Sequence, residues 1–229
     1  MKRHPLLLAA TVLATGVTCS ATAAVPTADA AGTRYVDMVF PATTLASNVV
    51  YANAPALITG TPMNLLLDVY QPTGDTLARR PALIAIHGGG FKGGDKAAVA
   101  DWSAEWARRG YVVFNINYRL DAGNKCQEIQ DGKVPPAQLA AETARCTAAI
   151  NAAQFDAHAA VRWVRANATT LRVDPTRIAA IGSSAGAVTA VHMAYRWENP
   201  GDIGDNDEIC AIAGIEAAGL TAIPGAGPG

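Results

Sequence analysis

Three short apolar runs, each followed by a helical pattern, constrain the fold of this chain more than any other feature. The runs cover residues 81–86 (PALIAI), 111–117 (YVVFNIN) and 178–181 (IAAI). Runs of this length that stay apolar at successive positions are typical of strands buried on both faces of a sheet. Strands that alternate with helices predict an α/β fold, with a mostly parallel sheet and helices on both of its faces.

The other expected elements follow from the same spacing rules. They are edge strands at 34–40 and 48–52, a strand at 63–70, helices at 96–109, 138–170 and from 186 onward, a turn at 174–177 and a last strand at 209–215. The helix at 138–170 is expected to break near Asn151. A chain of 229 residues, half of them apolar, is expected to form one domain with a sizeable core.

The sequence GSSAG at residues 182–186 matches G-x-S-x-G and lies between an apolar strand and a helix. A chain that turns from strand to helix here exposes one serine side chain on strained backbone, and glycines on both sides remove Cβ atoms that would collide with neighbours. The helix N-terminus also directs free N–H groups at a developing negative charge. The motif predicts Ser184 as a nucleophile, in preference to Ser183. The alternative is a glycine-rich turn that happens to hold a serine.

A second motif, HGGGF at residues 87–91, directly follows the strand at 81–86. Glycines let bare backbone N–H groups approach a tetrahedral oxyanion. We expect Gly89 and Gly90 to donate, together with the amide of Ala185, the residue after the nucleophile. The alternative is a phosphate-binding loop, but the lysine-serine/threonine pattern of the P-loop is missing here.

These motifs occur in order with NYRL (117–120), AAVRWVRANA (159–168) and DPTRI (174–178). In this order the chain resembles the α/β-hydrolase superfamily, close to the hormone-sensitive-lipase-like and BD-FAE-like carboxylesterases, over about residues 63–215. The resemblance implies the α/β-hydrolase fold, hydrolysis of a carboxylic ester through an acyl-serine intermediate, and no cofactor. It also implies that His87 and Gly88 support the oxyanion loop, with His87 not acting as the base, and that Arg119 and Asp156 stabilise the structure.

The catalytic acid and histidine of such an enzyme follow the nucleophile in the chain. The only histidine after Ser184 is His192, and eight residues of helix carry it about 12 Å along the axis, beyond the roughly 3 Å reach of a hydrogen bond. His158 is expected to be structural, and Glu216 is the one weak candidate acid. No triad acid or histidine is therefore identified. We expect the chain to lack the last strands of the fold and to be inactive or barely active alone.

The N-terminal residues 1–31 predict an export signal and leader. Basic residues precede an apolar run at 6–17, and small residues at 21–23 or 28–30 offer a cleavage site. The run is shorter than the about 20 residues that span a bilayer. A retained anchor and a lipid-modified Cys19 are the alternatives. The hydrolase domain, 32–229, is expected to be secreted or periplasmic, without a membrane span in its mature form.

Two cysteines, Cys126 and Cys146, bracket one loop-to-helix segment, and export permits a disulfide between them. The alternative is a set of unpaired buried thiols. Residues 121–154 form a longer connection than most, so they are a candidate small cap over the pocket. An ordinary surface excursion held by the disulfide is the other interpretation.

The charge pattern does not favour a nucleic-acid partner, because the formal net charge is −1 and no basic face is clustered. No His/Cys group has metal-ligand spacing. We therefore expect a small-molecule ester as substrate. Two alternatives stay open: a non-catalytic binding protein of the same fold, and an amidase or lactonase, because specificity resides in loops that the motifs do not determine.

Overall fold

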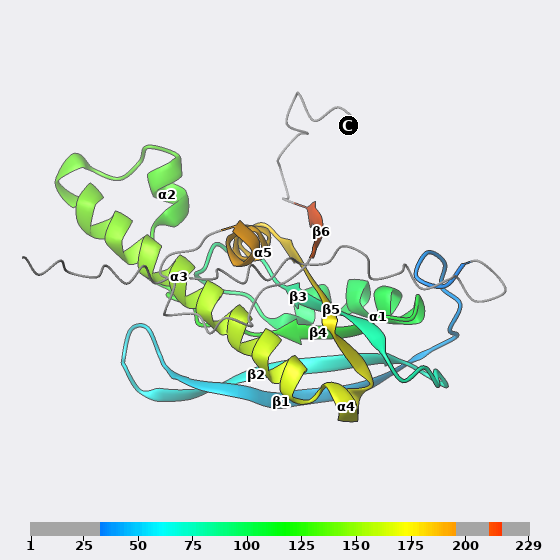
Figure 1. The fold of residues 1–229 in the computed structure, drawn as a ribbon. Coiled ribbons are helices and arrows are strands. Elements are labelled where there is room, and N and C mark those ends of the chain that lie inside the picture. Colours follow the sequence, from blue (N-terminus) through cyan, green and yellow to red (C-terminus); the bar gives the residue numbers. More distant parts are fainter. Residues whose placement is uncertain (1–32, 196–210, 217–229) are drawn as a thin grey trace, which may run out of the picture.

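A computed structural model describes residues 33–195 and 211–216 of the chain (Figure 1). These residues form a six-stranded sheet in the order β1-β2-β4-β3-β5-β6. The strands are β1 (Thr43–Pro55), β2 (Pro62–Pro72), β3 (Arg80–Ile86), β4 (Val112–Ile116), β5 (Val173–Ser183) and β6 (Ala211–Glu216). β1, β2 and β4 pair antiparallel, whereas β4, β3, β5 and β6 run parallel. This mixed sheet with flanking helices confirms the predicted α/β-hydrolase fold.

Helices cover both faces of the sheet (Figure 1). They are α1 (Ala100–Arg108), preceded by the short 3-10 helix η1 (Lys96–Val99), then α2 (Cys126–Gln130), α3 (Pro136–Ala166), α4 (Ala168–Leu171) and α5 (Ala185–Tyr195). The larger core lies between the sheet and α3 and α5, and a smaller core lies under α1 on the other face. Every residue of β3 and of β4 is buried, as the continuous apolar runs predict.

The predicted edge strand at 34–40 is wrong, because this segment is a turn. Tyr35 has a φ of 72°, and the Tyr35 amide donates to the carbonyl of Arg109 at 2.8 Å. The Phe40 amide donates to the carbonyl of Arg108 at 3.0 Å. The guanidinium of Arg34 lies over the rings of Tyr35 and Phe40. The rings of Tyr35 and Phe40 therefore pack around an arginine, and the backbone amides of these residues satisfy carbonyls at the end of α1.

The predicted break near Asn151 is also wrong, since α3 continues unbroken through this position. Asparagine lowers helix propensity by less than about 0.7 kcal/mol, and Ala149, Ala152 and Ala153 beside it are all buried against the sheet. Tertiary packing therefore outweighs the local preference. The turn at 174–177 lies within β5, but the ladder to β3 skips it: Val173 pairs with Arg80 and Ile178 with Ala82. The Asp174 carboxylate accepts the Thr176 amide at 3.1 Å, as in a turn.

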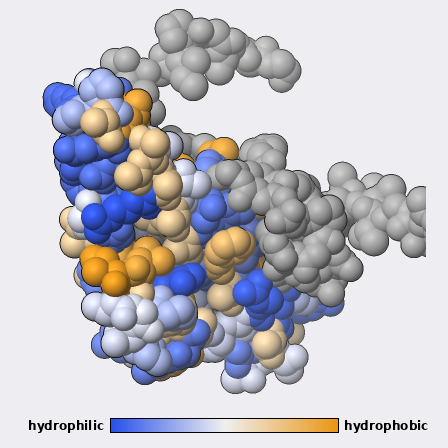
Figure 2. All heavy atoms as spheres, turned by 90° about the vertical axis from the view of Figure 1, so that its left-hand side faces the viewer, coloured by the Kyte–Doolittle hydropathy of each residue, from blue (hydrophilic) through white to orange (hydrophobic). Residues whose placement is uncertain are grey.

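One part of the molecule stands out from the sheet and its helices. We call residues 121–148, which comprise a loop, α2 and the N-terminal half of α3, the projecting hairpin (Figure 1). It contains the predicted disulfide, with Cys126 and Cys146 joined at an S–S distance of 2.05 Å. Figure 2 faces the side from which the hairpin projects and shows hydrophilic and hydrophobic residues mixed on its surface. Whether residues 121–154 cover a pocket as a cap stays a prediction.

The export signal at 1–31 and most of the chain after Tyr195 lie outside the described residues. Within residues 33–195 and 211–216, no helix combines the length and the hydropathy that a membrane crossing requires.

Candidate active site

Ser184 occupies the bend between a strand and a helix. β5 ends at Ser183 and α5 begins at Ala185, so Ser184 alone forms the connection. Its φ is 51°, in the left-handed region, and its side chain is exposed. A non-glycine residue held in this region costs about 1–3 kcal/mol, and such strain gathers at functional sites. The structure therefore gives Ser184 the strained and exposed position that the G-x-S-x-G motif predicts.

The two glycines of the motif are required by the space around the bend. A Cβ atom on Gly186 would lie 2.1 Å from the carbonyl oxygen of Ile86, at the end of β3. A Cβ atom on Gly182 would lie 2.3 Å from the carbonyl of Gly186. Both contacts are with backbone, which cannot move aside as a flexible side chain can. The bend therefore packs directly against the end of β3, where the oxyanion loop begins.

The oxyanion loop, residues 87–94, lies against the bend. A Cβ atom on Gly88 would lie 3.2 Å from the Cβ of Ser184. Gly89 has a φ of 115°, and a Cβ atom there would lie 1.9 Å from the carbonyl oxygen of Gly93. Gly90 also has a positive φ, 61°. These backbone shapes favour glycine, so the loop can approach the nucleophile only because side chains are missing.

Hydrogen bonds to the loop carbonyls fix the direction of its amides. The Gly88 carbonyl lies 2.6 Å from Nδ1 of His87, and the Gly89 carbonyl accepts from the amides of Lys92 and Gly93 at 3.0 and 3.2 Å. In a trans peptide the C=O and the following N–H point in opposite directions. The amides of Gly89 and Gly90 therefore point away from these partners. Among the described residues we find no acceptor for these two amides or for that of Ala185.

His87 supports the loop from a buried position. Its ring is fully buried and stacks on Tyr118, with the ring centroids 4.5 Å apart. The Tyr118 hydroxyl donates to the carbonyl of His87 at 3.0 Å. Burial lowers the pKa of His87 and raises the pKa of Tyr118, so a neutral ring with its proton on Nδ1 donates to Gly88. This ring is not available as an accessible base, in agreement with the role that the family resemblance implies.

Arg119 and Asp156 form an ion pair behind the site. The Asp156 carboxylate accepts from the amide, Nε and Nη2 of Arg119 at 2.8, 3.0 and 2.8 Å. Asp156 is buried, and burial raises its pKa while the hydrogen bonds from Arg119 oppose that rise. The pair joins the chain after β4 to α3, which is a structural function.

The described residues contain three histidines, His87, His158 and His192. His158 is buried on α3, and His192 is partly buried near the end of α5, two turns beyond Ser184. Glu216 is the last residue of β6 and pairs in register with Ser183, so its backbone lies next to the bend. The described residues hold no group of three or more His, Cys, Asp or Glu that could bind a metal ion.

Two residues that contact the oxyanion loop could not be predicted from the motifs. Tyr118 lies inside the NYRL motif, but nothing in the pattern shows that it stacks on His87. Asn124 lies in the projecting hairpin, and its side chain donates to the carbonyl of Gly90 at 3.3 Å. An asparagine before a helix is typical of a turn in which the side-chain oxygen accepts the amide two residues on, and Asn124 does accept the Cys126 amide. That signal predicts the turn, but not the contact with Gly90.

The strand order, the strained serine and the glycine loop together define an α/β-hydrolase. The profile of the BD-FAE family matches residues 67–134 and 140–211. The chain therefore belongs to the BD-FAE family, which is a carboxylesterase-type hydrolase family.

Several proteins that are similar to this chain are esterases. A chlorogenic acid esterase of Aspergillus niger is 30% identical over 143 residues, which cover 59% of this chain and 25% of that protein. A fumonisin B1 esterase of Sphingopyxis macrogoltabida is 33% identical, over 54% of this chain and 21% of that protein. The structure of Thermogutta terrifontis esterase 2 phosphonylated by sarin has a TM-score of 0.54 at 25% identity, over 75% of this chain and 54% of that one. The chain thus spans about a quarter of these curated relatives and about half of the esterase structure.

Proposed function

We propose that this chain carries the nucleophile and the oxyanion hole of a secreted serine esterase. The observation that carries the proposal is the position of Ser184, exposed on a φ of 51° beside the oxyanion loop. Three backbone amides near it, those of Gly89, Gly90 and Ala185, have no acceptor among the described residues. Preorganised donors of this kind stabilise the negative oxygen that forms during acyl transfer.

The reaction proceeds in two steps. The Ser184 oxygen attacks the ester carbonyl carbon and loses its proton to a base, which then protonates the departing alcohol. Water attacks the resulting acyl-serine, releases the carboxylic acid and restores the Ser184 hydroxyl. An unassisted hydroxyl is a weak nucleophile and needs a base. His87 is buried and bound to the Gly88 carbonyl, His158 is buried on α3, and His192 lies two helical turns beyond Ser184. We assign neither the base nor its acid partner to a residue of this chain, and we propose that the chain alone turns over esters poorly.

The names of the relatives favour small-molecule carboxylic esters as substrates. One relative is a chlorogenic acid esterase and another a fumonisin B1 esterase. The export signal predicted at 1–31 and the Cys126–Cys146 disulfide support a location outside the cytoplasm, because disulfides persist in oxidising compartments.

A fluorophosphonate probe tests the nucleophile, since the related Thermogutta esterase 2 was phosphonylated by sarin. In the full-length protein expressed from its own gene, we expect Ser184 to be labelled and S184A to lose the label. The matched control is S183A, which removes the neighbouring hydroxyl and should keep the label. Labelling that survives in S184A, or a folded wild type that never labels, would favour the non-catalytic binding protein. Turnover of p-nitrophenyl acetate, compared with a matched anilide and a lactone, separates an esterase from an amidase or lactonase.

A further inference from the structure

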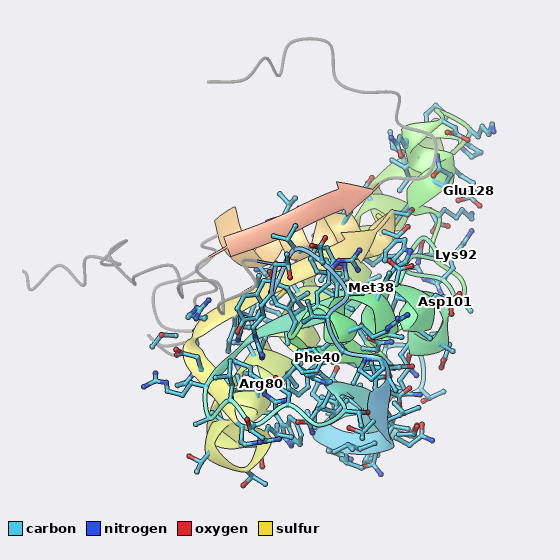
Figure 3. The ribbon with its side chains drawn as sticks, turned by 90° about the vertical axis from the view of Figure 1, so that its right-hand side faces the viewer. Met38, Phe40, Arg80, Lys92, Asp101 and Glu128 are labelled. Carbon is cyan, nitrogen blue, oxygen red and sulfur yellow. A yellow bond between two sulfur atoms is a disulfide. The ribbon has the colours of Figure 1, made fainter. Side chains whose placement is uncertain are left out.

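The projecting hairpin contacts the oxyanion loop at three consecutive residues. The Gly90 carbonyl accepts from the side-chain amide of Asn124 at 3.3 Å. The Phe91 carbonyl accepts from the backbone amide of Asp121 at 2.9 Å. The Lys92 ammonium pairs with Glu128 of α2 at 2.8 Å, and Figure 3 shows these two side chains next to each other. The loop is therefore held on its outer side by a part of the chain that carries none of the recognised motifs.

Gly90 needs such an external support more than its neighbours do. A Cβ atom on Gly89 would meet backbone at 1.9 Å, whereas nothing lies within 4 Å of a Cβ atom on Gly90. No neighbouring atom therefore encloses the side-chain direction of Gly90, and glycine itself has more conformational freedom than other residues. Hydrogen bonds must hold it, and the bond to the Gly90 carbonyl comes from Asn124.

Asn124 is fixed at both ends of its side chain. It is fully buried, its nitrogen also donates to the carbonyl of Asp121 at 3.0 Å, and its oxygen accepts the Cys126 amide at 3.1 Å. The side chain therefore connects the oxyanion loop to the first residue of α2. Because the nitrogen of this amide binds Gly90 and Asp121 while its oxygen binds Cys126, a substitution can remove the donor and keep the acceptor.

The hairpin is rigid enough to act as a support because cross-links hold it to α3. Cys126 is bonded to Cys146, and Asp121 pairs with Arg145 through Nε and Nη2 at 2.5 and 2.6 Å. Beyond Cys146, α3 enters the core at Ala149 and Ala153. The connection from the oxyanion loop through Asn124 and the disulfide thus ends in the packed body of the protein.

We propose that Asn124 is a positioning residue of the oxyanion hole and that the disulfide-linked hairpin keeps it in place. This inference rests on the proposed function. The amides of Lys92 and Gly93 bind the Gly89 carbonyl and so orient the peptide that carries the Gly90 N–H. Asn124 binds the carbonyl on the other side of Gly90, so the two contacts together restrict rotation about this glycine and keep its N–H directed toward the reacting carbonyl. Without that bond the Gly90 amide spends part of its time turned away, so the transition state loses stabilisation while the ground-state ester binds as before.

The decisive variant is N124D in the full-length protein. Aspartate keeps an oxygen for the Cys126 amide, but its carboxylate cannot donate to the carbonyls of Gly90 and Asp121. We expect kcat for p-nitrophenyl acetate to fall about 10- to 100-fold, up to the loss typical of one oxyanion donor, with KM little changed. Affinity for a trifluoromethyl ketone, which forms a tetrahedral adduct with the serine, should fall by a similar factor. Tm is expected to fall, because a buried carboxylate then faces the carbonyls of Gly90 and Asp121, so kcat is measured well below Tm and referred to the folded fraction.

Two further variants separate positioning from general damage. Q127A changes an exposed residue of the same helix and should leave kcat and inhibitor affinity unchanged. The double variant C126S/C146S keeps Asn124 but loosens its support, so we expect a smaller loss of kcat in the same direction, reproduced by reducing the wild type with dithiothreitol.

The outcomes distinguish the two proposals. If the wild type hydrolyses the ester and N124D retains its kcat and its inhibitor affinity, the positioning function of Asn124 is refuted and the esterase assignment stands. If N124D loses kcat only in proportion to a lower folded fraction, the residue is merely structural and the inference also fails. If the wild type and Q127A both lack turnover and Ser184 labelling, the proposed function fails and this inference with it.

Discussion

The bend at Ser184 and the projecting hairpin are held in shape in different ways. At the bend, Gly182 and Gly186 face backbone atoms so closely that no Cβ atom fits. In the hairpin, most of α3 before Ala149 is exposed, and a disulfide and ion pairs determine the arrangement. One added carbon should therefore disrupt the bend and be tolerated by the hairpin. Backbone contacts restrict the reacting group, while side-chain cross-links hold the structure that supports it.

The largest effect is expected from a Gly→Ala substitution at the bend. In G186A the new Cβ would lie 2.1 Å from the Ile86 carbonyl oxygen, so β3 and α5 must separate. We expect the free energy of unfolding to fall by about 5 kcal/mol or more, a loss seen only for severe structural conflicts. This change opposes the gain of about 1 kcal/mol that alanine brings inside a helix. Urea denaturation followed by circular dichroism measures it.

The matched control is G123A in the hairpin. There the added Cβ would lie 2.2 Å from Nη2 of Arg145, which is the far end of a flexible side chain and can move. We expect a change of less than about 1 kcal/mol. Equal losses in G186A and G123A would show that the two regions do not differ in the way described.

A smaller effect is expected from removing one partner of an ion pair. Asp156 is buried and bound by Arg119 through three donor atoms. D156A leaves the Arg119 charge without its partner, which typically costs about 3 to 5 kcal/mol of unfolding free energy. In the hairpin, Asp131 pairs with the exposed Lys133, and D131A should not change the denaturation midpoint measurably. A larger midpoint shift for D131A than for D156A would contradict the expectation that the buried ion pair stabilises the fold more than the exposed pair of the hairpin does.

The bend and its sheet could be predicted from the sequence because their constraints are local. Buried strands have unbroken apolar runs in the sequence. The position of Ser184 follows from Gly182 and Gly186, which are required where a strand turns tightly into a helix. The contact from Asn124 to Gly90 could not be predicted, because it joins residues 34 positions apart through a side chain whose local pattern indicates only a turn before α2. Residues 34–40 were misinterpreted for a similar reason: their amides bind the carbonyls of Arg108 and Arg109 at the end of α1, about 70 positions away in the chain.

The smallest effect is a dependence of stability on pH. The oxyanion loop beside the bend and the projecting hairpin are expected to lose stability at different pH values. Burial lowers the pKa of His87, so the unfolded chain binds a proton near pH 6.5 that the native ring does not bind. The stability that His87 contributes is present above that pH and is lost as the pH falls toward the native pKa. Hydrogen bonds from Arg145 lower the pKa of Asp121 in the hairpin, so its contribution is lost only below about pH 4.

H87N isolates the first of these contributions, because an asparagine side chain can still donate to the Gly88 carbonyl but does not titrate. We expect the unfolding free energy of the wild type to fall relative to that of H87N between pH 7 and pH 5, by at most about 1.4 kcal/mol per pH unit. Urea denaturation of both proteins at each pH gives this difference, in which His158 and His192 cancel. Parallel curves would mean that the His87 ring takes up a proton as easily in the native oxyanion loop as in the unfolded chain. The buried neutral imidazole that directs the Gly89 amide would then have to be abandoned.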